Sequence, residues 1–359
     1  MKIAIVGGGN IGTQFAVHCA EKGHEVTVVT SNPGVFQKDL CIVDDAGTIS
    51  HRGKIAKATN DPQEGYGDTD CILVTLPANM MKECAEQVYR FSKPSAVIGV
   101  VPGNGGSECA FSKCIDRGNT FFLLERVPAI ARLIEKGKTV KSTGYRKELH
   151  LSSLPAGKAQ ECCAFLEGIF DLPCVAIPGL LNLTMMPSNP ILHTTRLHSI
   201  FEDYHEGAVY ERIPLFYEDW DIRSAERLLA CDEEVQDICG ALPELRLHYV
   251  RSLREHYESP TAEAMKNKLR SIPAFRGITT PSVKVAGGYI PDLHSRYFTA
   301  DFSFGLSIIK QIADFASVPV PHIDATLNWY EKIKVEDNAF RYADYGITNR
   351  DSLINFYSR

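Results

Sequence analysis

The chain has 359 residues, of which 44% are hydrophobic and 23% are charged, and its formal net charge is −6. This length suits two domains, each with its own core. A net negative charge without a run of basic residues argues against a nucleic-acid or anionic-membrane partner, because clustered Lys and Arg recognise both. No apolar stretch approaches the roughly 18–20 residues that a bilayer-spanning helix needs.

The cysteines point to free thiols. There are eleven, an odd number, and no two of them have the C-x-x-C spacing of many zinc and redox sites. A disulfide framework or a metal site is therefore not expected. The first residues read as a strand rather than as a signal peptide. We expect a cytoplasmic protein with reduced cysteines.

The first 125 residues alternate β-branched runs with amphipathic stretches. Strands are predicted at 2–6, 25–30, 71–76, 96–101 and 120–124, with helices that include 11–22 and 79–91. This alternation predicts βαβ units, and hence a mostly parallel sheet with helices on both faces. A further β-rich passage, 139–151, predicts two strands joined around Gly144 that close the domain. We expect a Rossmann-type, doubly wound dinucleotide-binding domain over residues 1–178.

A glycine-rich turn follows the first predicted strand and directly precedes a helix. It reads Gly7-Gly8-Gly9-Asn10-Ile11-Gly12, which is a G-x-G-x-x-G. Gly7 permits the tight turn, Gly9 lets a pyrophosphate approach the backbone, and Gly12 lets the helix pack close to the strand. The pyrophosphate then lies at the helix N-terminus, beside Asn10 and Ile11. We expect a nicotinamide-dinucleotide site here; the alternative is a glycine turn without a ligand.

The end of the second strand bears on the choice between NADH and NADPH. An NAD enzyme usually carries Asp or Glu there to accept a hydrogen bond from the ribose 2′-hydroxyl. This chain instead has Thr30, Ser31 and Asn32, which are polar but not acidic. We therefore expect NADP(H) in preference to NAD(H), with Lys38 or Arg52 as cations that reach the 2′-phosphate. The alternative is that Ser31 and Asn32 only cap a turn.

Two more segments follow predicted strands. Leu76 and Pro77 come after the third strand, and the glycine-rich segment 102–106 comes after the fourth. The carboxyl ends of parallel strands are where open α/β sheets bind ligands. We count Leu76 and Pro77 as cofactor-binding residues, while segment 102–106 is equally well a ligand contact or a turn.

From about residue 180 the pattern changes to segments with a 3.6-residue period. Helices are predicted at 190–206, 220–241, 243–257, 260–271, 302–316 and 322–334. Pro and Gly separate these segments. Residues 179–359 are therefore predicted to form an all-α domain that carries the substrate and the catalytic groups. The expected fold class is α/β, with the parallel sheet first and the helical domain second.

The best candidate for a proton donor is His193. A hydride transfer to C=O or C=N needs such a donor. Asn189 followed by Pro190 predicts a helix that starts there, with Asn189 as the N-cap. His193 then shares an apolar face with Leu197 and Ile200. Burial and the helix dipole both favour a neutral imidazole at this place. A structural histidine bonded to a carbonyl group would give the same pattern.

A second polar cluster lies among aromatic residues at 295–305. Arg and Asp are costly to bury unless they are paired or bind a ligand. Arg296 can hold a substrate carboxylate through two parallel hydrogen bonds. Asp301 can accept a hydrogen bond from a histidine ring and so set its tautomer. The alternative is structural, with Asp301 as a helix cap and Arg296 paired with Asp292.

In this order, these features resemble the octopine/nopaline (opine) dehydrogenase family over most of the chain. The resemblance rests on the glycine turn, Glu125-Arg126-Val127-Pro128 followed by Arg132, Asn189-Pro190 with His193, Arg296-Tyr297 with Asp301, and residues 318–324. It implies a Rossmann domain, a helical domain and a substrate cleft between them. It also implies reductive condensation of a 2-oxo acid with the amine of an amino acid, with NAD(P)H as reductant.

The resemblance also implies roles for single residues. His193 would be the acid/base, Asp301 would orient it, and Arg296 would lie near a substrate carboxylate. Asn189 is counted with Arg296 as substrate-binding. The chain departs from the family pattern at Ala300, where members often carry an acid, and at 302–304, where a proline is common.

Two other functions remain open. One is a 2-oxo acid reductase similar to the ketopantoate reductases, which act without an amine and use a lysine as the acid. Lys266 and Lys268 lie in a predicted helix but in no recognisable motif. The other is a non-catalytic protein that senses NADPH. In each case the partners are small molecules rather than nucleic acid or membrane, and a homodimer is compatible with the sequence.

Overall fold

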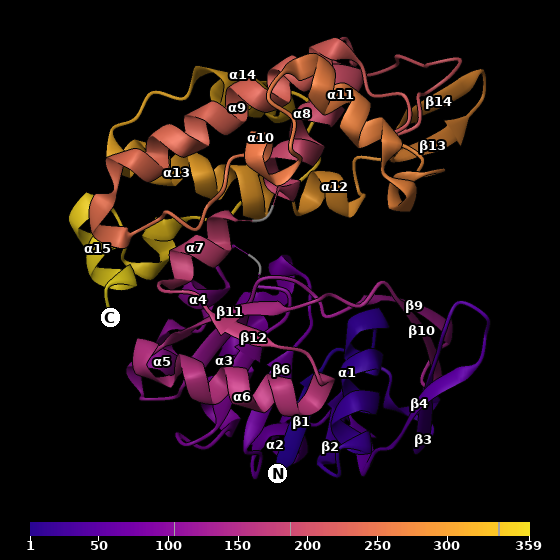
Figure 1. The fold of residues 1–359 in the computed structure, drawn as a ribbon, viewed down its shortest axis with the longest axis vertical. Coiled ribbons are helices and arrows are strands. Elements are labelled where there is room, and N and C mark those ends of the chain that lie inside the picture. The colour runs from indigo at the N-terminus through magenta and orange to yellow at the C-terminus, as the bar shows by residue number, and fades with distance from the viewer. Residues whose placement is uncertain (104, 187, 337) are drawn as a thin grey trace. The chain divides into compact units, whose positions relative to one another are not determined.

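The computed structural model describes residues 1–103, 105–186, 188–336 and 338–359 (Figure 1). It consists of two compact units, Met1–Thr184 with Tyr357–Arg359, and Met185–Phe356. The boundary expected from the sequence, between 178 and 179, lies six residues before the division at Thr184. Among the described residues, no helix is both long enough and apolar enough to cross a bilayer.

The first unit is built on an eight-stranded sheet in the order β12-β11-β8-β7-β6-β1-β2-β5. Its strands are β1 (Lys2–Val6), β2 (Glu25–Val29), β5 (Lys57–Thr59), β6 (Cys71–Val74), β7 (Val97–Val100), β8 (Phe121–Leu124), β11 (Leu149–Leu154) and β12 (Cys174–Ala176). All neighbours are parallel except β11 and β8. The five strands predicted in the first 125 residues are all present. Every residue of β6 and β8 is buried, as expected for a sheet covered on both faces.

Helices cover this sheet in two groups (Figure 1). They are α1 (Asn10–Glu21), α2 (Pro62–Tyr66), α3 (Met81–Phe91), α4 (Ser107–Ala110), α5 (Ser112–Asp116) and α6 (Ala159–Phe170), with 3-10 turns at Pro33–Val35, Ala78–Met80 and Ala156–Lys158. Helices α1 and α6 contact each other, and Phe15 meets Phe170 edge to face at 4.8 Å. Helices α2, α3, α4 and α5 contact one another instead. The predicted Rossmann-type fold is confirmed.

A second, four-stranded sheet in this unit was not predicted. It has the order β4-β3-β10-β9, from β3 (Asp39–Val43), β4 (Ile49–Lys54), β9 (Ile130–Glu135) and β10 (Thr139–Thr143). The two strands predicted in 139–151 exist, and Gly144 lies between them with φ of +61°. They do not pair with each other, because β10 joins this small sheet whereas β11 joins the large one.

A buried glutamate joins the two ends of the first unit. The Glu108 Oε1 atom accepts hydrogen bonds from Thr184 Oγ1 at 2.7 Å and from the Tyr357 hydroxyl at 2.6 Å. Burial raises the pKa of Glu108, and these two bonds partly oppose that effect. The hydrogen bond from Tyr357 explains why the last residues of the chain pack with the first unit.

The second unit is mainly helical. Its helices are α7 (Leu180–Met185, shared with the first unit), α8 (Asn189–Phe201), α9 (Ile222–Ala241), α10 (Leu253–His256), α11 (Ala262–Ser271), α12 (Arg296–Thr299), α13 (Ser307–Ala316), α14 (Pro321–Glu331) and α15 (Arg350–Tyr357), with 3-10 turns at Pro243–Leu245, Pro273–Phe275 and Tyr342–Tyr345. Helix α9 contacts α8, α11, α13 and α14. The buried ring of Phe302 stacks with those of Phe298 and Tyr330 in this unit.

Three predictions for this unit need correction. The helix expected at 243–257 is wrong, because Arg246 has φ of +50° and only a 3-10 turn and the short α10 form there. The unit is not purely helical, because a hairpin of β13 (Ser282–Val285) and β14 (Gly288–Pro291) turns at two glycines with positive φ. The helix expected at 302–316 begins as a π-helical turn over Phe302–Leu306, called the π-turn below, and continues as α13.

Asp232 on α9 provides a test of pH-dependent stability. It is 3% exposed, and its Oδ2 accepts a hydrogen bond from the Leu253 N–H at 2.8 Å. Burial raises its pKa from 3.8 to about 6. Ionising this carboxyl therefore costs more in the folded chain than in the unfolded chain, and the cost grows as the pH rises from 3.8 to about 6. We expect Asp232→Asn to raise the free energy of unfolding at pH 8 by up to about 3 kcal/mol.

Urea unfolding of Asp232→Asn at two pH values checks this expectation. The gain should disappear at about pH 3, below both pKa values, where the folded and the unfolded chain both carry a mostly protonated Asp232. Asp237→Asn, an exposed position on the same helix, is the matched control and should change stability little at either pH. An equal gain in unfolding free energy at both pH values would show that the gain does not come from ionisation of the Asp232 carboxyl.

Candidate active site

Helix α8 carries the predicted acid/base, His193. The helix begins at Asn189, with Ser188 as its N-cap, so the prediction of Asn189 as the cap is wrong by one residue. Ser188 already has near-helical angles (φ −67°, ψ −24°) and makes no side-chain cap bond. Such one-residue shifts are common at helix ends. The side chain of Asn189 is exposed.

His193 is held between an acid and a phenol. Its Nδ1 lies 2.8 Å from Asp301 Oδ2, and its Nε2 lies 3.0 Å from the Tyr217 hydroxyl. The imidazole is 3% exposed, and rings of Tyr297 and Phe216 pack on it at centroid distances of 4.4 Å and 5.5 Å. The structure therefore brings together His193 and Asp301, which are 108 residues apart in the sequence.

The π-turn places Asp301 opposite His193. Asp301 precedes this turn but makes no cap bond with its side chain, so the helix-cap alternative does not hold. Gly305, within the turn, lies against Pro190 of α8, and a Cβ added at Gly305 would be 2.9 Å from the proline ring. The absence of a side chain at this position lets the π-turn approach the first turn of α8. That close approach sets the separation between imidazole and carboxylate.

The polarity of the two hydrogen bonds follows from their partners. An ionised carboxylate only accepts hydrogen bonds, so Asp301 requires the proton on Nδ1 and leaves a lone pair on Nε2. Burial raises the pKa of Tyr217. The phenol therefore keeps its proton and donates it to Nε2. This arrangement prepares Nε2 to take up a proton and Asp301 to stabilise the resulting imidazolium.

Sequence reasoning missed Tyr217. It lies in an irregular segment between α8 and α9, where no period marks an inward-facing side. In the structure its ring stacks on Phe275 at a centroid distance of 4.0 Å, and the residue is buried. The adjacent aromatic pair Phe216-Tyr217 was the one available signal, and it does not distinguish a core tyrosine from a site tyrosine.

Arg296 lies one turn before Asp301, on α12. Its side chain is exposed, and its guanidinium carbon is 5.2 Å from the centre of the Tyr297 ring. The structural alternative, a pairing with Asp292, is not formed: across the described ranges, Arg296 has no carboxylate within 4.0 Å. Its charge contributes to the field at Tyr217. An exposed guanidinium beside an acid–base pair suits a carboxylate ligand.

The first unit contains a cavity of about 340 Å³ at the carboxyl ends of β1, β2 and β6. It is lined by Val6, Gly7, Gly8, Val29, Thr30, Ser31, Asn60, Tyr66, Leu76, Met80, Glu83, Cys84 and Gln87. Four predicted cofactor residues, Gly7, Thr30, Ser31 and Leu76, are thus brought together. The other predicted cofactor residues are not among the lining residues, namely Gly9, Asn10, Ile11, Gly12, Asn32 and Pro77. The cations Lys38 and Arg52 do not line the cavity either. Asn104 of the segment 102–106 lies outside the described residues.

The glycine turn has the shape that a pyrophosphate needs. Gly7 has φ of +108°, and a Cβ added at Gly12 would overlap the carbonyl group of Gly7. A Cβ added at Gly9 would meet nothing within 4 Å, so the space above this residue is open. Gly9 is also the N-cap of α1 and has no side chain to occupy the N–H groups of the first turn. These features fit a dinucleotide.

Asn10 has a structural contact in this turn. Its Oδ1 accepts a hydrogen bond from the Leu133 N–H on β9 at 2.7 Å. The side-chain oxygen of Asn10 is therefore engaged within the protein. Ile11 is partly buried and packs against the core cluster of the first unit. Glu83, an acid that lines the cavity from α3, was not anticipated.

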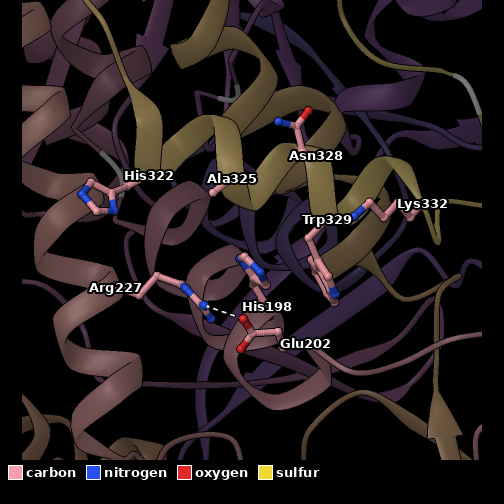
Figure 2. Close-up of a pocket in the computed structure, with 8 residues that line it drawn as sticks. All are labelled: His198, Glu202, Arg227, His322, Ala325, Asn328, Trp329 and Lys332. Atoms are coloured by element: carbon pink, nitrogen blue, oxygen red, sulfur yellow. Dashed lines mark hydrogen bonds and ion pairs between the residues drawn. The ribbon is translucent and has the colours of Figure 1, made fainter.

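A second cavity, of about 360 Å³, lies in the helical unit (Figure 2). Its lining comes from α8, α9 and α14 and comprises His198, Glu202, Arg227, His322, Ala325, Asn328, Trp329 and Lys332. Figure 2 shows His198 between Arg227 and Trp329. The His198 imidazole stacks on the Trp329 ring at a centroid distance of 4.9 Å. Burial, helped by nearby cations, lowers the pKa of His198 to about 3. This histidine stays neutral near pH 7, and its Nδ1 lies 3.2 Å from the Thr326 hydroxyl rather than beside a carboxylate of the described residues.

Two family models match different parts of the chain. Residues 176–334 match the family model described as NAD/NADP octopine/nopaline dehydrogenase, alpha-helical domain. Residues 3–122 match the model described as ketopantoate reductase PanE/ApbA. The range matched by the octopine/nopaline dehydrogenase model includes His193 and Asp301.

Individual relatives align over nearly their whole length. The tauropine dehydrogenase of Arabella iricolor is 25% identical over 362 residues, which cover 92% of this chain and 91% of that protein. The octopine dehydrogenase of Mizuhopecten yessoensis is 24% identical over 390 residues, with coverage of 99% and 96%. The solved structure of octopine dehydrogenase with NADH and L-arginine aligns with a TM-score of 0.86 at 22% identity, with coverage of 99% and 98%. The fold is therefore shared over both units.

Proposed function

Because the chain belongs to the octopine/nopaline dehydrogenase family, we propose that it condenses a 2-oxo acid with the amine of an amino acid and reduces the product. An opine dehydrogenase-like oxidoreductase is the general class. The observation that carries the specific reaction is the buried His193, with Asp301 on one ring nitrogen and Tyr217 on the other.

The acid–base chemistry of this reaction fits one histidine. Between the ammonium form of the amino acid and the C=N intermediate, the nitrogen loses two protons, and the carbonyl oxygen gains two and leaves as water. His193 Nε2 takes up each proton from the nitrogen in turn and returns it to the departing oxygen. Asp301 keeps Nδ1 protonated and stabilises the imidazolium between these two transfers. A bound nicotinamide dinucleotide supplies the hydride that completes the reduction of the C=N carbon.

Arg296 and Asn189 are the residues that we propose to contact the charged and polar groups of the substrates. A 2-oxo acid and an amino acid each carry a carboxylate, and Arg296 is an exposed guanidinium without an acidic partner in the described part of the chain. We propose that it binds one of these carboxylates through two hydrogen bonds. Asn189, exposed at the start of the helix that carries His193, is proposed as a second polar contact to the substrate.

The dinucleotide is assigned to the glycine turn of the first unit. The backbone of Gly7, Gly9 and Gly12 with Asn10 and Ile11 would hold the pyrophosphate at the start of α1. Thr30, Ser31 and Asn32 would face the adenosine ribose, and Leu76 and Pro77 would lie farther along the cofactor. We propose NADPH as the preferred reductant, because β2 ends without an acid. Glu83 opposes this preference, since its carboxylate lines the same cavity.

The ketopantoate-reductase-like alternative rests on the match of residues 3–122. It requires a lysine as acid in the helical unit. Lys266 pairs with Glu263 at 2.6 Å, and Lys268 pairs with Glu258 at 3.2 Å, both among exposed partners. Neither lysine contacts the buried His193. These ion pairs favour the histidine mechanism, but amine dependence is the direct test.

We expect reduced dinucleotide to be oxidised only when an oxo acid and an amine are both present. The measurement is the absorbance of NADPH or NADH with pyruvate or 2-oxoglutarate, with and without a panel of amino acids. NADPH should show the higher kcat/KM. Turnover independent of the amine would support the reductase alternative. A rise in Tm on adding NADPH, without turnover on the whole panel, would support a non-catalytic sensor.

A further inference from the structure

Three metal-ligating side chains meet in the first unit, away from the dinucleotide cavity. His18 and Glu21 lie one turn apart on α1, and His51 lies on β4, which packs against that helix. One donor atom from each of the three residues lies within 4.8 Å of the others. The set is called the His–Glu–His cluster below. Nothing in the sequence links His51 to the helix, so the cluster was not predicted.

The three side chains approach closely and are partly open to solvent. His51 Nδ1 lies 2.7 Å from Glu21 Oε2, and the two imidazole rings are 4.5 Å apart between centroids. His18 is 2% exposed, whereas the side chains of Glu21 and His51 are 33% and 31% exposed. The cluster therefore has a buried base and an accessible outer side through which an ion can enter.

Contacts around the cluster hold its members in place. The Arg52 N–H donates to Glu21 Oε1 at 3.2 Å, and His18 Nε2 lies 3.1 Å from the Tyr145 hydroxyl. Gly53 permits the approach of β4 to α1, since a Cβ there would press on the backbone of Val17. The charge of Lys22, next to Glu21, is matched by Asp171 at 2.7 Å. Such outer contacts orient the ligands in metal sites.

We propose that His18, Glu21 and His51 bind a divalent transition-metal ion of the Zn²⁺ type. Two imidazoles with one carboxylate suit Zn²⁺, Co²⁺ or Ni²⁺, whereas Mg²⁺ and Ca²⁺ prefer oxygen ligands alone. With Zn–N bonds of about 2.0–2.1 Å, three tetrahedral donors lie roughly 3.3 Å apart, so small side-chain rotations close the site. A water or the Tyr145 hydroxyl completes the coordination.

The role of the ion would be structural. It would join α1, which begins directly after Gly9 of the glycine turn, to the four-stranded sheet through β4. Both elements belong to the first unit, and no group assigned to the proposed reaction is a ligand. Binding is therefore expected to raise the Tm of the chain in proportion to the logarithm of the free metal concentration. This site stands independently of the proposed enzymatic activity.

The test is a metal titration of the full chain after chelator treatment and removal of the chelator. We expect one Zn²⁺ per chain with a dissociation constant in the micromolar range or below, measured by calorimetry. Co²⁺ should give a visible absorption spectrum typical of nitrogen and oxygen ligands. His51→Ala and Glu21→Gln, at partly exposed positions that preserve folding, should each weaken Zn²⁺ binding by at least about 10–100-fold.

His150→Ala is the matched control. His150 contacts Glu125 at 2.9 Å and Glu148 at 3.1 Å, but it is not part of a three-donor group of the required spacing among the described residues. This variant should bind Zn²⁺ as the unaltered chain does. Equal binding by the His51→Ala and unaltered chains, or no binding of Zn²⁺ by the unaltered chain at millimolar concentration, would overturn the proposal.

Discussion

Turnover should fall by at least about 100-fold when His193 is replaced by alanine. His193 bonds to both a carboxylate and a phenol. Without it, neither the amine proton nor the departing oxygen has a positioned partner. Steady-state kcat with the best oxo acid and amine measures the loss, and circular dichroism and Tm show whether the variant is folded.

Two further variants separate chemistry from packing at this histidine. Asp301→Asn keeps the size of the side chain but removes the charge that stabilises imidazolium, so kcat should again fall steeply while Tm changes little. Tyr217→Phe keeps the stacked ring and removes only the hydroxyl, and its loss in kcat should be smaller. A folded His193→Ala variant with near-normal kcat would remove His193 from the mechanism.

The second large effect is expected at Gly12. A Cβ there would overlap the backbone carbonyl of Gly7, and a backbone carbonyl cannot rotate away as a side chain can. Gly12→Ala should therefore displace α1 from β1, lower the free energy of unfolding by at least about 2 kcal/mol and weaken dinucleotide binding at least about 100-fold. Urea unfolding and fluorescence titration with NADPH measure the two effects.

Gly9→Ala is the informative partner of that variant. Gly9 has φ of −87°, which alanine adopts readily, and a Cβ would meet nothing within 4 Å. The free chain should keep its stability, while dinucleotide affinity should fall because the methyl group occupies the space assigned to the pyrophosphate. Unchanged affinity for NADPH in Gly9→Ala would show that the dinucleotide does not lie over this turn.

The sequence was most informative where local pattern and burial coincide. The central strands β6 and β8 are short, fully apolar runs, because both their faces are buried. The strand β4, with the sequence ISHRGK, carries polar and charged side chains and gives no such signal. In segment 243–257 the pattern predicted a helix that does not form. Its spaced, buried leucines are typical of a helix, but the backbone turns at Arg246.

In the candidate site, too, some residues are marked by their local sequence and others are not. His193 and Asp301 each stood out locally, one by its place near a helix start and the other by its charge among aromatic residues. Their contact could not be derived from spacing, because it depends on how the π-turn meets α8. Tyr217 and Glu83 gave no signal, since each becomes part of a site only through tertiary packing.

The π-turn has a consequence for how this acid–base pair can arise and be lost. Such a turn holds one more residue than the α-helical turn it replaces. Each residue of an α-helix advances by about 100° around the axis. Removing one residue from Phe302–Leu306 would let α13 run back as a regular helix and carry Asp301 to another side, away from the imidazole. A single-codon deletion, with no ligand residue changed, would then be enough to disconnect the pair.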